Sequence, residues 1–331
     1  MKRIKRFFTL LILLLIVVFL LGPKPEKPEL NKDLPSISVS VPNLDRYIKK
    51  QEADLPLKPD NQSRIIWAND SLKERTDYCV LYLHGFSASW FEGAPVHQKF
   101  ARHFNCNLYI PRLHDHGLQT SEALIDMTPD KLWESAKSAL MVARSLGKKV
   151  IIMSTSTGGT LGLKLAADFP EYVEGLYLFS PNIRINNSSA FVLTKPWGLQ
   201  IARLVTGGKY RITNNDFGAK ECEYWNCKYR LEAVVFLQQL VEATMKKDTY
   251  KNVTAPVFLG YYYKDEAHQD ETVRVDAMLE MFEQLGTSDD KKFKKAFPNA
   301  NTHVIACDMF SSSVDDLFRE SIRFGEEVLG L

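Results

Sequence analysis

The sequence is poor in cysteine and has no zinc motif. Its 331 residues include five cysteines, an odd number that does not suit a disulfide framework. They are Cys79, Cys106, Cys222, Cys227 and Cys307. Cys222 and Cys227 are close enough in sequence to bridge in an oxidising compartment, and five buried thiols suit the sequence equally well. No pair of cysteines or histidines has zinc-ligand spacing, so no metal is expected.

The chain also lacks an excess of charge of one sign. It has 42 basic and 40 acidic residues, a formal net charge of +2, and its basic residues are scattered apart from an N-terminal cluster. This balance gives no reason to expect nucleic acid as a partner. The apolar share of 45% and the charged share of 25% are ordinary for a globular protein. The length allows one large domain with an insertion or two small domains.

One long apolar run follows the basic cluster. Residues 7–21 are apolar except for Thr9. About 15 helical residues reach about 23 Å, short of the hydrocarbon core of about 30 Å, and snorkelling of Lys5 and Arg6 extends that reach. No small-x-small cleavage pattern precedes Pro23, and no cysteine follows the run, which excludes a lipoprotein signal. We expect residues 1–22 to be an uncleaved, single-pass transmembrane signal anchor, in preference to the cleaved signal of a secreted protein.

The charge before this run predicts the orientation of the chain. Basic residues ahead of an apolar segment keep the N-terminus cytoplasmic, which would put residues 23–331 on the extracytoplasmic side of a membrane. Residues 23–42 are rich in proline and lysine, a composition typical of linkers. The expected organisation is an anchor over residues 1–22, a tether over 23–59 and one domain over 60–331.

Beyond about residue 60, short apolar runs alternate with amphipathic stretches. The expected strands cover residues 64–67, 78–83, 107–110, 149–153, 173–179, 256–262 and 292–297. Several are almost continuously apolar, as expected for strands covered on both faces. This order predicts an α/β fold with a mostly parallel, doubly wound sheet. The alternation stops between Asn182 and Ala255, which indicates an insertion.

The strongest local motif follows the apolar run Val150–Met153. It reads Ser154-Thr-Ser156-Thr-Gly158-Gly159 and precedes a helical stretch. A nucleophile elbow needs a sharp strand-to-helix turn with small residues two before and two after the serine. Gly158 meets this need on one side, and Ser154 replaces the usual glycine on the other. We predict that Ser156 is a nucleophile.

A second motif, His84-Gly85-Phe86, ends an earlier strand. With the elbow, it makes the chain from about residue 60 onward resemble the α/β-hydrolase superfamily. The resemblance implies a sheet of about eight strands with a helical cap after the sixth, here at about 183–250. It implies an oxyanion hole formed by the N–H groups of Phe86 and Thr157, with His84, Gly85 and Gly158 as supporting residues. It implies no organic cofactor.

The remaining candidates come late in the chain. The superfamily places a histidine after the last strand, and His303 is the only one of seven histidines with that order and context. It would act as base for Ser156. The acid follows the strand at 256–262, where both Asp265 and Asp270 qualify. We prefer Asp270 because its spacing to the next helix suits the acid, and Asp265 remains the alternative.

The resemblance implies a serine hydrolase that cleaves carboxylic esters through an acyl-enzyme. A carboxylesterase, lipase or lysophospholipase acting on small-molecule or lipid esters is favoured, with the membrane as a partner through the N-terminal helix. This fold hosts many activities, so the substrate class stays open. The alternatives are an anchored, non-catalytic binding protein and a serine peptidase or acyltransferase with the same triad. Ser154 and the undecided acid keep the binding protein in consideration.

Overall fold

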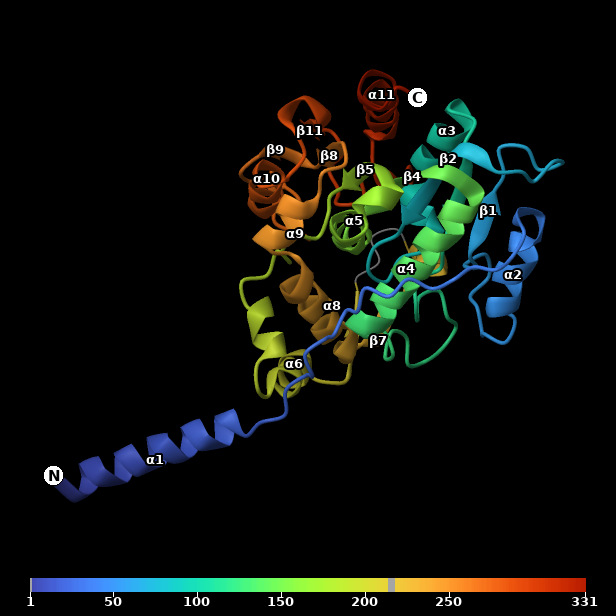
Figure 1. The fold of residues 1–331 in the computed structure, drawn as a ribbon. Coiled ribbons are helices and arrows are strands. Elements are labelled where there is room, and N and C mark those ends of the chain that lie inside the picture. The colour runs from blue at the N-terminus through green and yellow to red at the C-terminus, as the bar shows by residue number, and fades with distance from the viewer. Residues whose placement is uncertain (1, 214–217) are drawn as a thin grey trace.

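The computed structural model describes residues 2–213 and 218–331, and a seven-stranded sheet lies at its centre (Figure 1). The strand order is β1-β3-β2-β4-β5-β8-β11. β1 pairs with β3 in the antiparallel sense, and every other pair in this sheet is parallel. The strands are β1 (Arg64–Ile66), β2 (Thr76–Leu83), β3 (Asn107–Ile110), β4 (Gly147–Thr155), β5 (Val173–Phe179), β8 (Val257–Tyr261) and β11 (Lys292–Ala296). All seven expected strands are therefore confirmed to within two residues, in a sheet of seven strands among the described residues where about eight were expected.

Helices cover both faces of the sheet (Figure 1). Side chains alternate between the faces along each strand, so Leu81 belongs to one apolar cluster and its neighbour Tyr82 to the other. This arrangement confirms the predicted doubly wound fold. The first cluster includes α4 (Pro129–Leu146), α5 (Thr157–Asp168) and α10 (Val275–Glu283), and the second includes α3 (Val96–His103) and α11 (Val314–Phe324). Short turns are η3 (Pro170–Tyr172), η5 (Asp289–Lys291) and the π-turn η6 (Gly325–Leu329).

The insertion lies between β5 and β8, and we call its residues 183–250 the cap. Its elements are η4 (Ala190–Thr194), α6 (Gly198–Thr206), β6 (Tyr210–Ile212), α7 (Ala219–Tyr224), β7 (Lys228–Arg230), α8 (Leu231–Thr244) and the start of α9 (Lys247–Asn252). The cap was expected to be helical, and it also contains the antiparallel pair β6 and β7. A disulfide joins Cys222 to Cys227, which resolves the alternative left open by the sequence. Cys79, Cys106 and Cys307 are free and buried.

Residues 23–59 lie along the domain and do not form the expected free tether. They contain η1 (Val41–Asn43) and α2 (Leu44–Gln51). Leu30 and Leu44 are buried in the main core. The ammonium of Lys137 on α4 donates to the carbonyl of Asp33 at 2.6 Å. A few apolar side chains among the prolines and lysines thus dock the segment onto the domain, which composition alone did not reveal.

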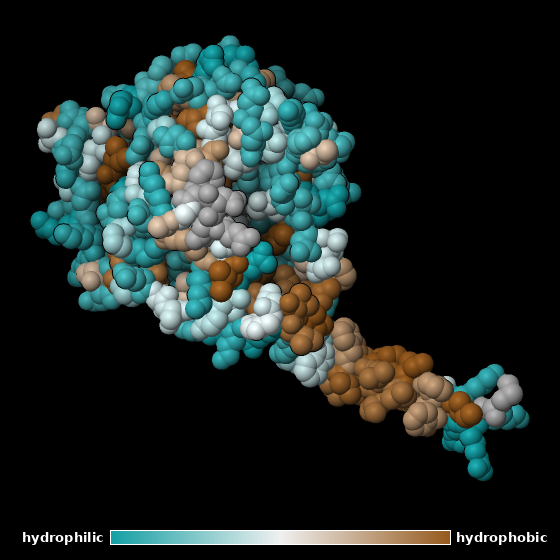
Figure 2. Space-filling model, turned by 180° about the vertical axis from the view of Figure 1, so that it is seen from behind, coloured by the Kyte–Doolittle hydropathy of each residue, from teal (hydrophilic) through white to brown (hydrophobic). Residues whose placement is uncertain are grey.

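Helix α1 (Lys2–Leu20) projects away from the domain, and Figure 2 shows its apolar surface in brown. None of its residues is buried. No helix among the described residues is long and apolar enough to cross a membrane. Four of the first five residues of α1 are basic, which leaves a short uncharged stretch. The expected transmembrane span is therefore not supported.

Candidate active site

Ser156 lies in the turn between β4 and α5. Its φ of 54° and ψ of −118° fall where residues other than glycine are rarely found. Its N–H donates to the carbonyl of Phe179 at 3.0 Å, and its own carbonyl accepts from the N–H groups of Gly159 and Asn182, both at 2.9 Å. These bonds tie the turn to the neighbouring strand and helix, so the strained conformation is held by the surrounding fold.

The small residues around Ser156 differ in what they do. A Cβ atom on Gly158 would lie 1.9 Å from the carbonyl oxygen of Leu83, so only glycine allows α5 to approach β2 this closely. Ser154, where glycine is usual, is fully buried, and its hydroxyl donates to the carbonyl of Tyr177 at 3.1 Å. The departure from the motif is accommodated because the hydroxyl has a partner inside the sheet.

His303 and Asp270 form a hydrogen-bonded pair. His303 Nδ1 lies 2.7 Å from Asp270 Oδ2. The other carboxylate oxygen of Asp270 accepts from the N–H groups of Thr272 at 2.9 Å and Val273 at 3.0 Å. Asp270 is 1% exposed. A buried carboxylate held on both oxygens fixes the orientation of the imidazole.

Asp265, the alternative acid, lies elsewhere. It ends β9 (Tyr263–Asp265), which pairs with β10 (His268–Gln269) in a small hairpin. Its side chain is half exposed, and its Oδ1 lies 2.8 Å from His268 Nδ1. The structure brings Asp270 to His303 and leaves Asp265 with His268.

The charge of Asp270 affects the pKa of His303. Burial lowers this pKa, but the carboxylate and its hydrogen bond raise it, and the net result is a pKa above the ordinary value of 6.5. His303 Nε2 is buried and has no hydrogen-bond partner among the described residues. It is therefore not bonded to the hydroxyl of Ser156, a bond that often tightens only when substrate binds.

The loop at residues 84–86 lies against Ser156. His84 Nε2 accepts from the N–H of Leu113 at 3.1 Å, and His84 Nδ1 lies 3.0 Å from the carbonyl oxygen of Gly85. Burial lowers the pKa of His84 to about 4, so its neutral ring braces this loop. Among the described residues, the N–H groups of Phe86 and Thr157 donate to no backbone or side-chain acceptor. Two free donors therefore remain beside the serine, as an oxyanion hole requires.

A buried acid that the sequence analysis missed lies behind this loop. Glu92, in the turn η2 (Trp90–Gly93), accepts a hydrogen bond from the N–H of Gly85. A Cβ atom on Gly85 would lie 2.8 Å from Glu92 Oε1 and 2.9 Å from Ser156 Cβ. The glycine therefore separates the carboxyl group from the serine. The available signal was a single acid within the otherwise apolar stretch at residues 90–93.

Two cavities lie near the cap. One of about 430 Å³ is lined by His303 together with Trp225 of the cap and Phe310. A larger one, of about 890 Å³, is lined by residues of α8 and α10 and contains neither Ser156 nor His303. The smaller cavity is the better candidate for a substrate because it reaches a chemically competent group.

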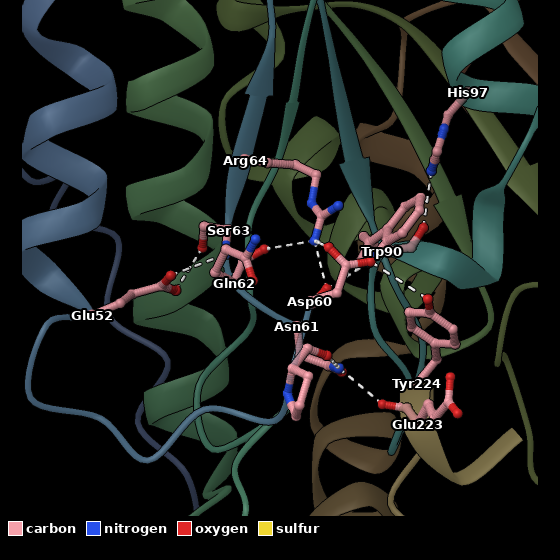
Figure 3. Close-up of polar contacts among 11 residues, drawn as sticks. Glu52, Asp60, Asn61, Gln62, Ser63, Arg64, Trp90, His97, Glu223 and Tyr224 are labelled. Atoms are coloured by element: carbon pink, nitrogen blue, oxygen red, sulfur yellow. Dashed lines mark hydrogen bonds and ion pairs between the residues drawn. The ribbon is translucent and has the colours of Figure 1, made fainter. Parts of the chain in front are cut away.

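Trp225, in the disulfide-closed cap loop at residues 222–227, contributes to the wall of this smaller cavity. The N–H of Asn226 donates to the carbonyl of Ser87 at 2.8 Å, next to the loop at residues 84–86. On the other side, Asn61 Nδ2 donates to the carbonyl of Glu223 at 2.8 Å. Figure 3 shows this anchoring, with Asp60 between Trp90 and Tyr224. The cap loop is thus bonded both to the site and to the segment before β1.

Comparisons with known proteins bear on the fold. No family model and no curated protein matches this chain. A structure from the metagenome-derived lipolytic enzymes LipS and LipT matches with a TM-score of 0.65 and 17% identity, over 81% of this chain and 98% of that one. The monoacylglycerol lipase of Paleococcus ferrophilus matches with a TM-score of 0.55 and 13% identity, over 81% and 98%. Est1E of Butyrivibrio proteoclasticus, bound to ferulic acid, matches with a TM-score of 0.53 and 15% identity, over 82% and 96%.

These proteins share the architecture described above, at identities that speak for the fold alone. In this chain, the parallel sheet has one antiparallel edge strand, and the strained turn after β4 carries Ser156. The sheet, the turn and the similarities together show that the chain has the α/β-hydrolase fold.

Proposed function

We propose that this protein is a serine hydrolase that cleaves carboxylic esters, with Ser156 as nucleophile, His303 as base and Asp270 as the acid that orients the base. The observation that carries the proposal is the hydrogen bond of 2.7 Å between His303 and a fully buried Asp270, in a site where Ser156 occupies a strained turn. Lipolytic and esterase structures among the similar proteins support esters as the substrate class.

The proposed reaction has two halves. Ser156 Oγ attacks the ester carbonyl carbon while its proton passes to His303 Nε2, and the negative charge on the carbonyl oxygen is stabilised by the N–H groups of Phe86 and Thr157. The bond to the alcohol then breaks, the alcohol takes the proton from His303, and an acyl-enzyme remains. Water then attacks the acyl carbon and loses a proton to His303. The bond from that carbon to Ser156 Oγ breaks, His303 returns the proton to Ser156, and the carboxylic acid leaves.

The test is covalent labelling of the full-length protein with a fluorophosphonate probe, followed by peptide mapping. We expect label on Ser156 in the wild type and none in Ser156→Ala or His303→Ala. Removal of a triad member commonly lowers the rate by about 10⁴–10⁶, so the contrast is large. His103→Ala is a matched control, because this exposed histidine at the end of α3 faces Glu326 and does not line the cavity beside His303.

The unpartnered Nε2 of His303 favours a second candidate, a binding protein that has kept the fold without the activity. A folded wild type that takes no label would support this candidate and reject the hydrolase. If Ser156 is labelled, product analysis with added alcohols or amines separates a hydrolase from an acyltransferase, and peptide substrates test for a peptidase.

We also propose that the domain works on the extracytoplasmic side of a membrane. Disulfides persist in oxidising compartments, and the bond between Cys222 and Cys227 supports this location. Mass spectrometry of the protein from its native cells, without reducing agent, is expected to show this pair as one cross-linked peptide. A reduced pair in alkylated lysate would contradict the proposal.

We further propose that α1 associates with a membrane. A contiguous exposed apolar surface marks an interaction site, and its basic N-terminal residues suit anionic lipid headgroups. In the full-length chain, the double substitution Leu13→Asp and Ile16→Asp is expected to move the protein from the membrane fraction to the soluble one. Wild-type protein in the soluble fraction would reject the proposal.

A further inference from the structure

Glu92 is a buried acid that the proposed triad does not use. It is 2% exposed, and only Asp270 among the described acids is more deeply buried. Asp270 has His303 as its partner, whereas Glu92 lies behind the loop at residues 84–86. Burying an acid is costly unless it is hydrogen-bonded or neutral. The contacts of Glu92 should therefore show why an acid is buried here.

The first contact is with the loop that carries one oxyanion donor. The carboxyl group of Glu92 accepts the N–H of Gly85, the residue directly before Phe86. A peptide group is planar, so fixing the N–H of Gly85 restrains the backbone that presents the next N–H. The space that a side chain at Gly85 would need is filled by Glu92 and Ser156. The carboxyl group is thus packed directly behind the donor of Phe86.

The second contact is with the turn that carries the other donor. Glu92 interacts with the hydroxyl of Tyr82, which in turn lies 2.9 Å from the hydroxyl of Thr155. Thr155 directly precedes Ser156, and Thr157 follows it. A chain of polar groups therefore connects Glu92 to both halves of the oxyanion hole.

We propose that Glu92, in its neutral form, is a positioning residue that aligns the N–H groups of Phe86 and Thr157, and that its ionisation weakens catalysis. This inference rests on the proposed function, because it assigns a role within the same site.

The surroundings of Glu92 keep it neutral. Burial raises its pKa to about 8, although the N–H of Gly85, the charge of His303 and the hydroxyl of Tyr82 act in the opposite direction. The remaining titratable neighbour, Cys307, has a pKa raised to about 12 by burial and stays uncharged. At pH 7 the carboxyl group therefore accepts the N–H of Gly85 without adding negative charge beside the oxyanion.

Ionisation of Glu92 is expected to lower activity at alkaline pH. Well below pH 8, Glu92 is neutral and only holds the loop. As the pH rises through about 8, the group becomes negative, and its charge opposes the negative charge that develops on the substrate oxygen. The kcat of the wild type should therefore fall on the alkaline side, by about tenfold or more.

The experiment compares full-length wild type with Glu92→Gln and Glu92→Leu, using p-nitrophenyl butyrate from pH 6 to pH 10 with the spontaneous hydrolysis subtracted. Glutamine keeps the acceptor for Gly85 and cannot ionise, so kcat at pH 7 should stay within about threefold and the alkaline fall should disappear. Leucine removes the acceptor, so kcat should fall by about 10² at every pH with little change in KM, as expected when a donor is displaced. Glu52→Gln is the matched control, because Glu52 is a nearly buried acid that is bonded to Ser63, as Figure 3 shows, and to Arg112, and it has no hydrogen bond to Gly85 or Ser156 among the described residues.

Two outcomes would overturn the inference. One is an alkaline fall in Glu92→Gln with the same midpoint as in the wild type, and the other is equal kcat in Glu92→Leu and Glu92→Gln. Fluorophosphonate labelling of the wild type separates this failure from failure of the proposed function. Absence of label on Ser156 rejects the hydrolase itself, whereas a labelled Ser156 with unchanged pH profiles rejects the role of Glu92 alone. If Glu92→Leu does not fold, the pH profile of the isosteric Glu92→Gln decides.

Discussion

The carboxyl ends of the sheet strands, where Ser156 lies, and the cap beside them are held in different ways. Ser156 is 6% exposed and is held by backbone hydrogen bonds to Phe179 and Asn182. Asp270 is 1% exposed, and its carboxylate is held by the N–H groups of Thr272 and Val273 in its own loop. Within α6 of the cap, Gly198 is the only buried residue, while Leu204 and Val205 are about four-fifths exposed. The proposed catalytic residues Ser156 and Asp270 therefore lie in a tightly packed part of the fold. Within the cap, α8 is buried in the main core, whereas α6 has a looser surface and the loop at residues 222–227 is held by its disulfide.

From this contrast, the largest effect on kcat is expected at Asp270, the proposed acid. Asp270→Asn is expected to lower kcat by about 10⁴, because an amide cannot stabilise the imidazolium of His303 and favours the wrong tautomer. Asp265→Asn, in an exposed hairpin, is expected to change kcat by less than about twofold. Steady-state kinetics on both variants would check this, and comparable losses would reject Asp270 as the acid.

Two glycines offer a sharper comparison between the regions. A Cβ atom at Gly158 would collide with the carbonyl of Leu83, whereas one at Gly208 in the cap meets no described residue within 4 Å. Gly158→Ala should therefore lower the free energy of unfolding by about 3 kcal/mol and kcat by about 10². Gly208→Ala should change stability by less than about 0.5 kcal/mol. Urea unfolding and kinetics measure both, and similar losses would mean that the cap is as tightly constrained as the sheet.

The loss of activity at low pH tests the environment of His303. The proposed reaction needs neutral His303, whose pKa is raised by Asp270 above its ordinary value of 6.5. Activity should therefore be lost as the pH falls through this raised pKa, by about tenfold for each further pH unit. In Asp270→Asn the midpoint should move to lower pH because the negative partner is gone. A profile of kcat/KM with an unmoved midpoint would show that another group titrates.

The smallest expected effect is in the cap. The double substitution Cys222→Ser and Cys227→Ser opens a six-residue loop. Because the unfolded chain gains entropy, the free energy of unfolding should fall by about 2 kcal/mol. Because this loop lines the cavity beside His303, KM should rise a few-fold while kcat changes little. Cys79→Ala leaves the disulfide intact and is the matched control. A large drop in kcat instead would place the cap loop among the parts that position the chemistry.

Whether a feature of the site could be predicted depends on how far apart in the sequence the interacting residues lie. The turn at Ser156 was predictable because its requirement for small neighbours is local, within two residues of the serine. The preference for Asp270 came from its distance to the next helix, and the structure places that residue at His303. The pairing itself joins positions 33 residues apart and follows from the parallel order of β5, β8 and β11.

Other features had no local pattern to reveal them. Glu92 looks like an ordinary loop acid until η2 folds it under Gly85. Residues 23–59 have the composition of a linker, yet Leu30 and Leu44 find an apolar surface on the domain. Such contacts depend on the shape of a surface built from distant segments, which composition does not describe.

By itself, the sequence determined the order of strands and helices, because the alternation of apolar runs and caps follows from side-chain periodicity along a short stretch of chain. It also determined which serine lies in a strained turn. The tertiary structure alone decided which acid meets His303, that Cys222 and Cys227 are bonded, and that Glu92 is buried behind the loop at residues 84–86. Each of these depends on where the sheet and cap place groups relative to one another in space, since burial and the low dielectric it creates exist only once the chain has folded.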